Sequence, residues 1–310
     1  MKTSRSSNSI SAPFSASTQP VSRRAALGAI AGSTTAVVAA SLAQRLGAAE
    51  AAAGDSLKGR VNHSVCKWCY DKVPLEDLCV AGKKMGLRSV ELLEVKDFPT
   101  LRKYDLVCAM ITGVPGGITK GLNRLENHDK IVEFYEWAAP KVAEAGFKNI
   151  ICFSGNRDGM SDEQGLENCA IGLKRIAPIC EKNKVVAVME LLNSKVNHKD
   201  YMCDHTAWGV DLCKRVGSDA FKLLYDIYHM QIMEGDLIAS IKKWHSYIAH
   251  YHTGGVPGRH EIDETQEIHY PAVMKAIVET GFKGFVAQEF IPARKDVIAS
   301  LQQGVRICDV

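Results

Sequence analysis

The sequence lacks the features that point to a nucleic-acid-binding or nucleotide-binding protein. Its 38 Lys and Arg against 35 Asp and Glu leave a net charge of only +3, which is too small to indicate a nucleic-acid partner. No glycine-rich segment carries the P-loop or dinucleotide-binding fingerprint. A chain of 310 residues that is 46% hydrophobic and 24% charged is typical of a globular protein with one large core.

A complete structural zinc motif is also missing. His63, Cys66 and Cys69 form one H-x-x-C-x-x-C half, but no second half follows at a suitable spacing. Residues three apart on a strand point to opposite faces, so these side chains are not expected to share an ion. We interpret residues 61–66 as a first strand, followed by a loop that carries Trp68. The cysteines do not predict a disulfide framework, because that argument applies to short secreted chains.

Long, strongly apolar runs are absent as well. Residues 1–53 are Ser- and Thr-rich at first, continue with Arg23 and Arg24, and then contain an Ala/Gly/Val run over 25–43. This order is typical of a twin-arginine export signal, and the run is too rich in Ala and Gly for a spanning helix. We expect cleavage, no stable membrane insertion and a periplasmic location. The alternatives are an uncleaved anchor or disordered tail, and a cytoplasmic protein if the signal is not used.

The remaining residues, 54–310, alternate between strand and helix patterns. Strands are expected at 61–66, 88–93, 106–111, 149–153, 185–190, 221–226, 247–252 and 285–289. Helices are expected at 75–85, 129–145, 161–183, 201–216, 237–244, 271–280 and 295–306, with a short connection after the second strand. Gly86, Gly146 and Gly281 each stand between a helix and a strand, where glycine ends helices. The pattern predicts an α/β protein with a single (β/α)₈ TIM barrel of ordinary length.

Four predicted strands end in a side chain that can bind a metal ion. These side chains are Glu190, Asp226, His252 and Glu289, spaced by about one βα unit each. Each alone would be an ordinary surface charge, but the carboxyl ends of barrel strands converge on one pocket. The set predicts one divalent ion, with Mn²⁺ or Mg²⁺ favoured and Co²⁺ or Zn²⁺ also compatible. Replacing Glu91, which ends another strand, is expected to leave metal binding intact.

Two further residues are candidates for substrate binding. His229 lies three residues beyond Asp226 and outside the strand, so we expect it to orient or polarise the substrate rather than bind the ion. Arg259, in a glycine-rich loop after the seventh strand, can pair with a substrate carboxylate through a bidentate contact. An ordinary surface arginine is the alternative. The loops after the strands predict a small polar pocket for a small-molecule substrate.

The segment Tyr-Asp-Ile-Tyr-His-Met-Gln at residues 225–231 closely resembles the signature of the hydroxypyruvate isomerases, members of the xylose isomerase-like barrel superfamily. The same resemblance extends to 190–193, 233–235, 267–270 and 289–290. It implies a metal-dependent isomerase of a small hydroxy-keto acid or ketose. In such enzymes the positions of Glu190 and Glu289 bind the ion and move a proton through a metal-stabilised enediolate, while that of His229 contacts substrate.

Other activities stay open on the same barrel. Comparable hydroxypyruvate isomerases have Gln at the position of His252, whereas the ketose 3-epimerase branch has His there, as this chain does. The epimerases also carry an additional acid a few residues after the first glutamate, and this chain has Ser194 and Lys195 near that position instead. A ketose 3-epimerase or a metal-dependent dehydratase is therefore an alternative. An endonuclease would need more histidines and a basic face, and an exported sugar-binding protein would normally have two lobes. The sequence leaves open whether the chain forms a homo-oligomer.

Overall fold

A computed structural model describes residues 56–310, which form one unit. The predicted export signal at residues 1–53 lies outside the described residues. Within 56–310, no helix combines the length and apolar character that a membrane span requires.

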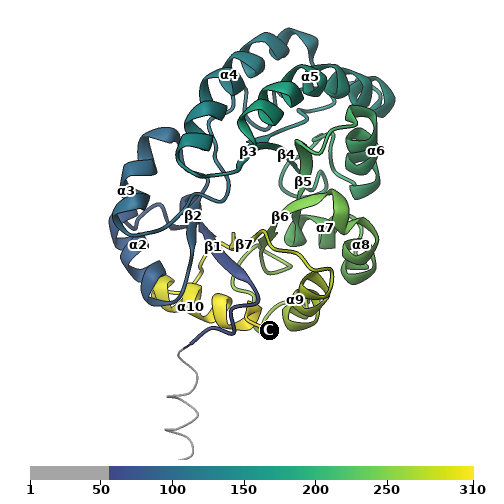
Figure 1. The fold of residues 1–310 in the computed structure, drawn as a ribbon. Helices are drawn as coiled ribbons and strands as arrows, with labels where there is room; N and C mark the ends of the chain where they lie inside the picture. Colours follow the sequence, from purple (N-terminus) through teal and green to yellow (C-terminus); the bar gives the residue numbers. More distant parts are fainter. Residues whose placement is uncertain (1–55) are drawn as a thin grey trace, which may run out of the picture. The chain divides into compact units, whose positions relative to one another are not determined.

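Residues 56–310 contain seven strands in one parallel sheet with the order β2-β1-β7-β6-β5-β4-β3. The strands are β1 (Asn62–Cys66), β2 (Ser89–Glu91), β3 (Asn149–Cys152), β4 (Val186–Glu190), β5 (Phe221–Asp226), β6 (Ile248–Thr253) and β7 (Phe285–Gln288). Nearly every residue of these strands is buried, as expected for a sheet covered on both faces. Figure 1 shows the strands at the centre of the unit with the helices around them.

The segment predicted as the third strand closes the sheet into a barrel, although it forms only isolated bridges. These bridges are Ser89–Val107 and Leu93–Ile111 toward β2, and Ile111–Ile150 toward β3. The ladder is interrupted at Ala109, whose N–H donates to Ser89 Oγ (2.9 Å) and whose carbonyl accepts from Asn149 Nδ2 (2.9 Å). Side chains take the place of ladder bonds there, so eight strand positions surround the core as predicted.

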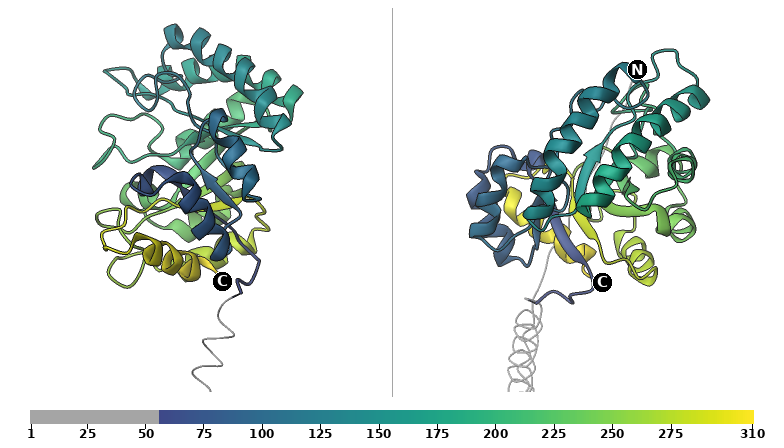
Figure 2. Two further views of the ribbon diagram at one scale, coloured as in Figure 1. Left: turned by 90° about the vertical axis from the view of Figure 1, so that its left-hand side faces the viewer. Right: turned by 45° about the horizontal axis from the view of Figure 1, so that its top comes forward.

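Nine α-helices lie within residues 56–310. They are α2 (Leu75–Lys84), α3 (Phe98–Lys103), α4 (His128–Glu144), α5 (Asp162–Asn183), α6 (Thr206–Val216), α7 (Ile227–Met233), α8 (Leu237–Trp244), α9 (Tyr270–Glu279) and α10 (Val297–Cys308). Short 3₁₀ turns are η1 (Lys67–Tyr70), η2 (Val95–Asp97), η3 (Leu125–Asn127) and η4 (His245–Tyr247). The long helices α4 and α5 pack side by side, as both further views show (Figure 2).

One helix begins later than its sequence pattern predicts. A helix was expected from residue 201, but α6 starts at Thr206 because the preceding segment is held in other contacts. Tyr201 forms an antiparallel bridge with Asn156, and its hydroxyl donates to the Glu190 carbonyl (3.0 Å). The end of α6 matches the prediction, since Gly217 adopts φ +70°, the left-handed conformation that terminates helices.

Candidate metal centre

The structure brings together the four predicted metal-ligand side chains at the carboxyl end of the barrel. Glu190 and Asp226 end β4 and β5, His252 lies near the end of β6, and Glu289 directly follows β7. One donor atom from each lies within 4.8 Å of those of the others, and all four side chains are buried. Parallel strands therefore place residues from four separate βα units around one point.

Asp226 both caps a helix and faces the centre. Its Oδ1 accepts a hydrogen bond from the backbone N–H of His229 (2.9 Å), which fixes the first turn of α7. Its Oδ2 has no hydrogen-bond partner among the described residues, and the nearest cation is Arg259 Nη2 at 3.6 Å. Burial raises the pKa of Asp226 well above its ordinary value. An unpaired, buried carboxylate oxygen thus points at the centre.

The two glutamates differ in how they are held. Glu190 Oε1 lies 3.3 Å from His252 Nδ1 without a hydrogen bond to any described group, and burial raises the pKa of Glu190. Glu289 contacts three donors: Trp68 Nε1 (2.9 Å), Arg259 Nη2 (2.6 Å) and His252 Nδ1 (2.9 Å). Burial alone would raise the pKa of Glu289, but His252 and Arg259 outweigh it and hold this pKa well below the ordinary value. Glu289 is held ionised, whereas Glu190 is free to exchange a proton.

A second buried cluster contacts the other nitrogen of His252. Glu91 Oε1 lies 3.0 Å from His252 Nε2 and 2.7 Å from His250 Nε2, while Ser64 Oγ donates to Glu91 Oε2 (2.5 Å). Burial would raise the pKa of Glu91, but the two imidazoles lower it to about 2. Cys66 Sγ also lies 3.6 Å from His252 Nε2. From the sequence, Glu91 was expected to play no part in metal binding, and His250 was not considered. His250 and His252 lie two residues apart on β6, so their side chains share a face of the strand.

His229 is set to donate a hydrogen bond into the centre. The backbone N–H of Asn193 donates to His229 Nδ1 (3.1 Å), so this nitrogen is an acceptor and the hydrogen of the neutral ring is on Nε2. Burial keeps the ring neutral by lowering its pKa well below the ordinary value. Nε2 is 3.7 Å from Asp226 Oδ2 and has no hydrogen-bond partner in residues 56–310. The contact of His229 with substrate stays a prediction.

Arg259 also belongs to the centre, so the alternative of a surface arginine is wrong. Its side chain is only 10% exposed and pairs with Glu289. The guanidinium carbon lies 5.1 Å from the ring centroid of Trp68 and 5.4 Å from that of Tyr228. Burial opposes ionisation, but the charges of Glu289 and Asp226 raise the pKa of Arg259. The guanidinium therefore stays charged and lies beside the carboxylates of Glu289 and Asp226.

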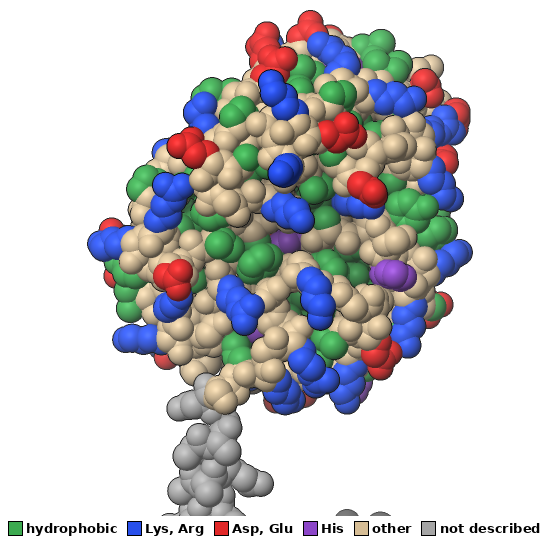
Figure 3. Space-filling model, viewed as in Figure 1, with side chains coloured by type: hydrophobic (Ala, Val, Ile, Leu, Met, Phe, Trp, Pro, Cys, Tyr) green, Lys and Arg blue, Asp and Glu red, His purple; other side chains and the backbone are tan. Residues whose placement is uncertain are grey.

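A cavity of about 420 Å³ opens beside these residues, a size suited to a small molecule. Its lining residues are Trp68, Leu92, Thr112, Ile118, Ile151, Phe153, Glu190, Leu192, His198, Arg259 and Glu289. A larger cavity of about 530 Å³ involves residues before and at the start of several strands, including Phe147, Val186 and Ile248. None of the four ligand candidates lines the larger cavity, so the smaller one is the candidate site. On the face seen in Figure 3, acidic and basic side chains both surround a central area where histidine is visible.

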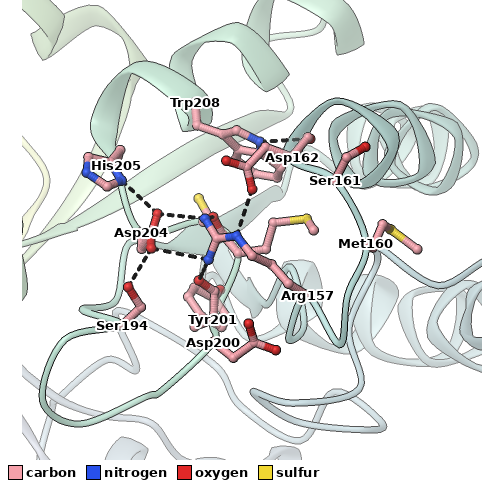
Figure 4. Close-up of polar contacts among 12 residues, drawn as sticks. Arg157, Met160, Ser161, Asp162, Ser194, Asp200, Tyr201, Asp204, His205 and Trp208 are labelled. Carbon is pink, nitrogen blue, oxygen red and sulfur yellow. Dashed lines mark hydrogen bonds and ion pairs between the residues drawn. The ribbon is translucent and has the colours of Figure 1, made fainter.

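A further charged group, which we call the Arg157 cluster, supports the loops beside the centre (Figure 4). It consists of Arg157, Asp162, Ser194, Asp204 and His205. Arg157 pairs with both Asp204 oxygens (3.1 and 3.2 Å) and with Asp162 Oδ1 (2.7 Å). Ser194 Oγ donates to Asp204 Oδ2 (2.6 Å), and His205 Nδ1 lies 2.7 Å from Asp204 Oδ1. The cluster joins the loops that follow β3 and β4.

Curated proteins with similar sequences are isomerases by name. Hydroxypyruvate isomerase of Escherichia coli (strain K12) is 33% identical over 160 residues, covering 50% of this chain and 60% of that protein. The putative hydroxypyruvate isomerase of Homo sapiens is 29% identical over 129 residues, covering 42% of this chain and 46% of that protein. The chain thus spans about half the length of these relatives.

Solved structures and a family comparison agree on the fold. The crystal structure of AP endonuclease, family 2, from Brucella melitensis superposes with a TM-score of 0.68 at 22% identity, covering 79% of this chain and 97% of that one. This likeness shows a shared fold. The family model for the xylose isomerase-like TIM barrel matches residues 83–306. Fold, topology and family match together identify the chain as a member of the xylose isomerase-like TIM barrel family.

Proposed function

We propose that the protein is a metal-dependent isomerase of a small hydroxy-keto acid or ketose. The observation that carries this proposal is the convergence of Glu190, Asp226, His252 and Glu289 at the carboxyl end of the barrel, beside a cavity of small-molecule size. The isomerase names of the curated relatives support the same reaction class.

The donor set fits one divalent cation. Three buried carboxylates and one imidazole converge, and Glu190 Oε1 and Asp226 Oδ2 lack any hydrogen bond from described groups. Unpaired buried charge is costly, and a cation would compensate it. Oxygen-rich ligands with a single imidazole suit Mn²⁺ or Mg²⁺ best, with Co²⁺ and Zn²⁺ also acceptable. When bound, such an ion supplies Lewis-acid polarisation of a substrate carbonyl.

The proton is moved by the two glutamates. Isomerisation removes a C–H proton beside a carbonyl and returns a proton at a neighbouring carbon or on the other face. Glu190 has a free buried oxygen and a raised pKa, so it can exchange a proton, whereas Glu289, held ionised by Trp68 and Arg259 on the β7 side, can accept one. One carboxylate can then take the proton while the other returns it. His229 Nε2–H is available to donate to a substrate oxygen. Arg259 provides positive charge for a substrate carboxylate or oxyanion.

Ketose 3-epimerisation is the second candidate activity. It is favoured by His252 at the sixth-strand position of the structure, the residue found there in the epimerase branch that the sequence resembles. A dehydratase would begin with the same removal of a proton. The three reactions share the glutamates and differ in where the proton or hydroxyl finally goes.

Product analysis separates these activities. Metal-free protein is incubated with Mn²⁺, Mg²⁺ or Co²⁺ and a panel of small hydroxy-keto acids and ketoses, and products are identified by NMR. A positional isomer supports the isomerase, an inverted stereocentre the epimerase and loss of water the dehydratase. Substrate binding without conversion under any metal would contradict an enzymatic role and favour a binding protein.

We also propose that residues 1–53 direct export through the twin-arginine route. The support is Arg23-Arg24 followed by the Ala/Gly/Val run. Cell fractionation of the full chain should find it in the periplasm, and replacing both arginines by lysine should retain it in the cytoplasm. Equal distribution of the two proteins would contradict the proposal.

A further inference from the structure

We infer that Glu91 is a positioning residue that fixes the ring of His252 so that Nδ1 faces the metal ion. This inference rests on the proposed metal-dependent function. It concerns a residue from β2 that reaches a ligand on β6, and β1 and β7 lie between these strands in the sheet.

The two nitrogens of His252 face different groups. Nδ1 lies 2.9 Å from Glu289 Oε2 and 3.3 Å from Glu190 Oε1, within the proposed ligand set. Nε2 lies 3.0 Å from Glu91 Oε1. An ionised carboxylate only accepts hydrogen bonds, so Nε2 must carry the hydrogen. Nδ1 faces the ionised Glu289 in the same way, so it carries a hydrogen as long as no cation is bound. A bound cation displaces the Nδ1 hydrogen, and with the other hydrogen kept on Nε2 by Glu91 the lone pair on Nδ1 points at the ligand set.

Glu91 itself is held rigidly. Ser64 Oγ donates to its Oε2 (2.5 Å), and His250 Nε2 lies 2.7 Å from its Oε1. All of these side chains are almost completely buried. The register of β1 and β2 pairs Cys66 with Glu91, so the carboxylate is fixed by the barrel itself and not by a loop. Removing a carboxylate that orients a metal-binding imidazole typically lowers metal affinity about 10- to 100-fold.

Glu91, His250 and His252 also form a buried group whose donor atoms lie close enough together to hold an ion. The 3.0 Å between Glu91 Oε1 and His252 Nε2 is the length of a direct N–H···O hydrogen bond. Glu91 therefore acts on His252 directly, and the number of ions bound per chain tests this against a second ion.

Metal affinity of matched variants tests the inference. Calorimetric titration with Mn²⁺ compares wild type with Glu91→Leu, which removes the acceptor, and Glu91→Gln, which keeps the size and removes the charge. We expect Mn²⁺ to bind Glu91→Leu about 10- to 100-fold more weakly and Glu91→Gln about 10-fold more weakly. Val90→Ala is the control, because Val90 is buried on the same strand and belongs to the apolar core. It should bind Mn²⁺ as wild type does.

A spectroscopic signature separates positioning from loss of stability. In Zn²⁺-loaded protein with ¹⁵N-labelled histidine, the Nε2–H proton of His252 should resonate far downfield and exchange slowly. His252→Gln identifies the resonance. The signal should persist in Val90→Ala and move upfield or broaden in Glu91→Gln. The Glu91→Gln variant keeps the test informative if Glu91→Leu does not fold.

The outcomes distinguish this inference from the function on which it rests. Absence of metal binding by the wild type would overturn the proposed metal centre and the role of Glu91 with it. Metal binding of equal affinity in wild type and Glu91→Gln would overturn the role of Glu91 alone. Two ions per wild-type chain, one of them lost in Glu91→Gln, would also overturn it by making Glu91 a ligand.

Discussion

The candidate metal centre and the Arg157 cluster are both carboxylate-rich groups beside the carboxyl ends of the strands, yet the hydrogen-bonding capacity of their polar atoms is satisfied very differently. In the cluster, Arg157, Ser194 and His205 together contact both oxygens of Asp204. In the centre, atoms of Glu190, Asp226 and His229 have no hydrogen-bond partner among the described residues. Groups that pair with one another stabilise the fold, whereas buried groups left unpaired are available to a ligand.

The two regions are also connected. Tyr201 lies in the loop that the Arg157 cluster holds, and its hydroxyl donates to the backbone carbonyl of Glu190. The satisfied cluster therefore fixes the loop against which the unsatisfied centre is built. This division of roles predicts opposite responses to the same kind of substitution in the two regions.

The largest effect should come from the glutamates of the centre. Glu190→Gln and Glu289→Gln each remove a carboxylate proposed to bind the ion and move the proton. We expect turnover to fall roughly 100-fold or more in each variant, the scale of general acid–base catalysis. Steady-state kinetics with the substrate found by product analysis measures this, and turnover in D₂O should place deuterium on the reacting carbon unless one base returns the same proton.

Glu94→Gln is a suitable control, because Glu94 is an exposed acid that lies outside the ligand set. Full activity in either Gln variant of the centre would contradict the two-glutamate mechanism. Intact hydride transfer that is insensitive to both changes would point to a hydride-shift route instead.

The next effect concerns Asp226, where function and stability should change in opposite directions. Asp226→Asn keeps an oxygen that can cap α7 but removes the negative charge. Mn²⁺ affinity should fall by more than about 100-fold, which exceeds the usual effect of replacing a residue that only contacts a ligand. The metal-free variant should be more stable than metal-free wild type, because burial raises the pKa of Asp226 and the folded protein therefore disfavours its ionised form at neutral pH. Calorimetric titration and urea unfolding measure the two quantities.

Unchanged metal affinity or lower stability in Asp226→Asn would contradict the contrast between the centre and the Arg157 cluster. If Asp226→Asn keeps wild-type metal affinity, Asp226 is not a ligand. If the variant loses stability in the metal-free state, its carboxylate is satisfied in the fold in the same way as that of Asp204, and the unpaired oxygen has no functional meaning.

His229 should affect turnover without affecting the metal. His229→Ala removes a donor proposed to contact a substrate oxygen, and hydrogen bonds to charged groups are worth about 1.5–3 kcal/mol, which corresponds to roughly 10- to 150-fold in turnover. Mn²⁺ content should stay at the wild-type level, as metal analysis of the purified protein can show. Loss of the metal would place His229 in the ligand set.

The sequence predicted the barrel and the convergence of the four candidate ligands because both depend on local pattern. Asp226 ends an apolar run and also caps the next helix, so one residue carries both signals. The third strand was predicted as regular but forms only bridges, since Ser89 and Asn149 take the backbone groups of Ala109. Such side-chain contacts across 20 and 40 residues leave no periodic signal.

The residues that contact the candidate ligands were harder to predict than the candidate ligands themselves. Glu91 was expected to be irrelevant to metal binding, yet it contacts His252 across 161 residues of sequence. That contact follows from the closure of the barrel, which brings β2 and β6 to a common interior. Local pattern gives the direction of each side chain, but only the closed barrel determines which strand ends meet.

The smallest effect should come from Asp204, and its dependence on pH is the sharpest test of the comparison. Burial alone would raise the pKa of Asp204, but hydrogen bonds from Arg157, Ser194 and His205 outweigh it and hold this pKa below the ordinary value. A carboxyl group whose pKa is lowered by folding stabilises the protein above its unfolded pKa of about 3.9, and this contribution is lost as the pH falls through the folded value.

Asp204→Asn should therefore lower the free energy of unfolding by roughly 2 kcal/mol at pH 7, the scale of hydrogen bonds to a charged group. The difference from wild type should shrink as the pH falls below about 4, where Asp204 takes up a proton first in the unfolded state and then, through its lower pKa, in the folded state. Urea unfolding of metal-free protein at several pH values measures this difference.

Asp105→Asn is the control, because Asp105 pairs with Lys83 on the surface with its side chain 96% exposed, and such pairs contribute about 1 kcal/mol at most. A difference that is as small for Asp204 as for Asp105, or that stays constant with pH, would show that the Arg157 cluster does not stabilise the loops through its charge. The contrast with the metal centre would then rest on Asp226 alone.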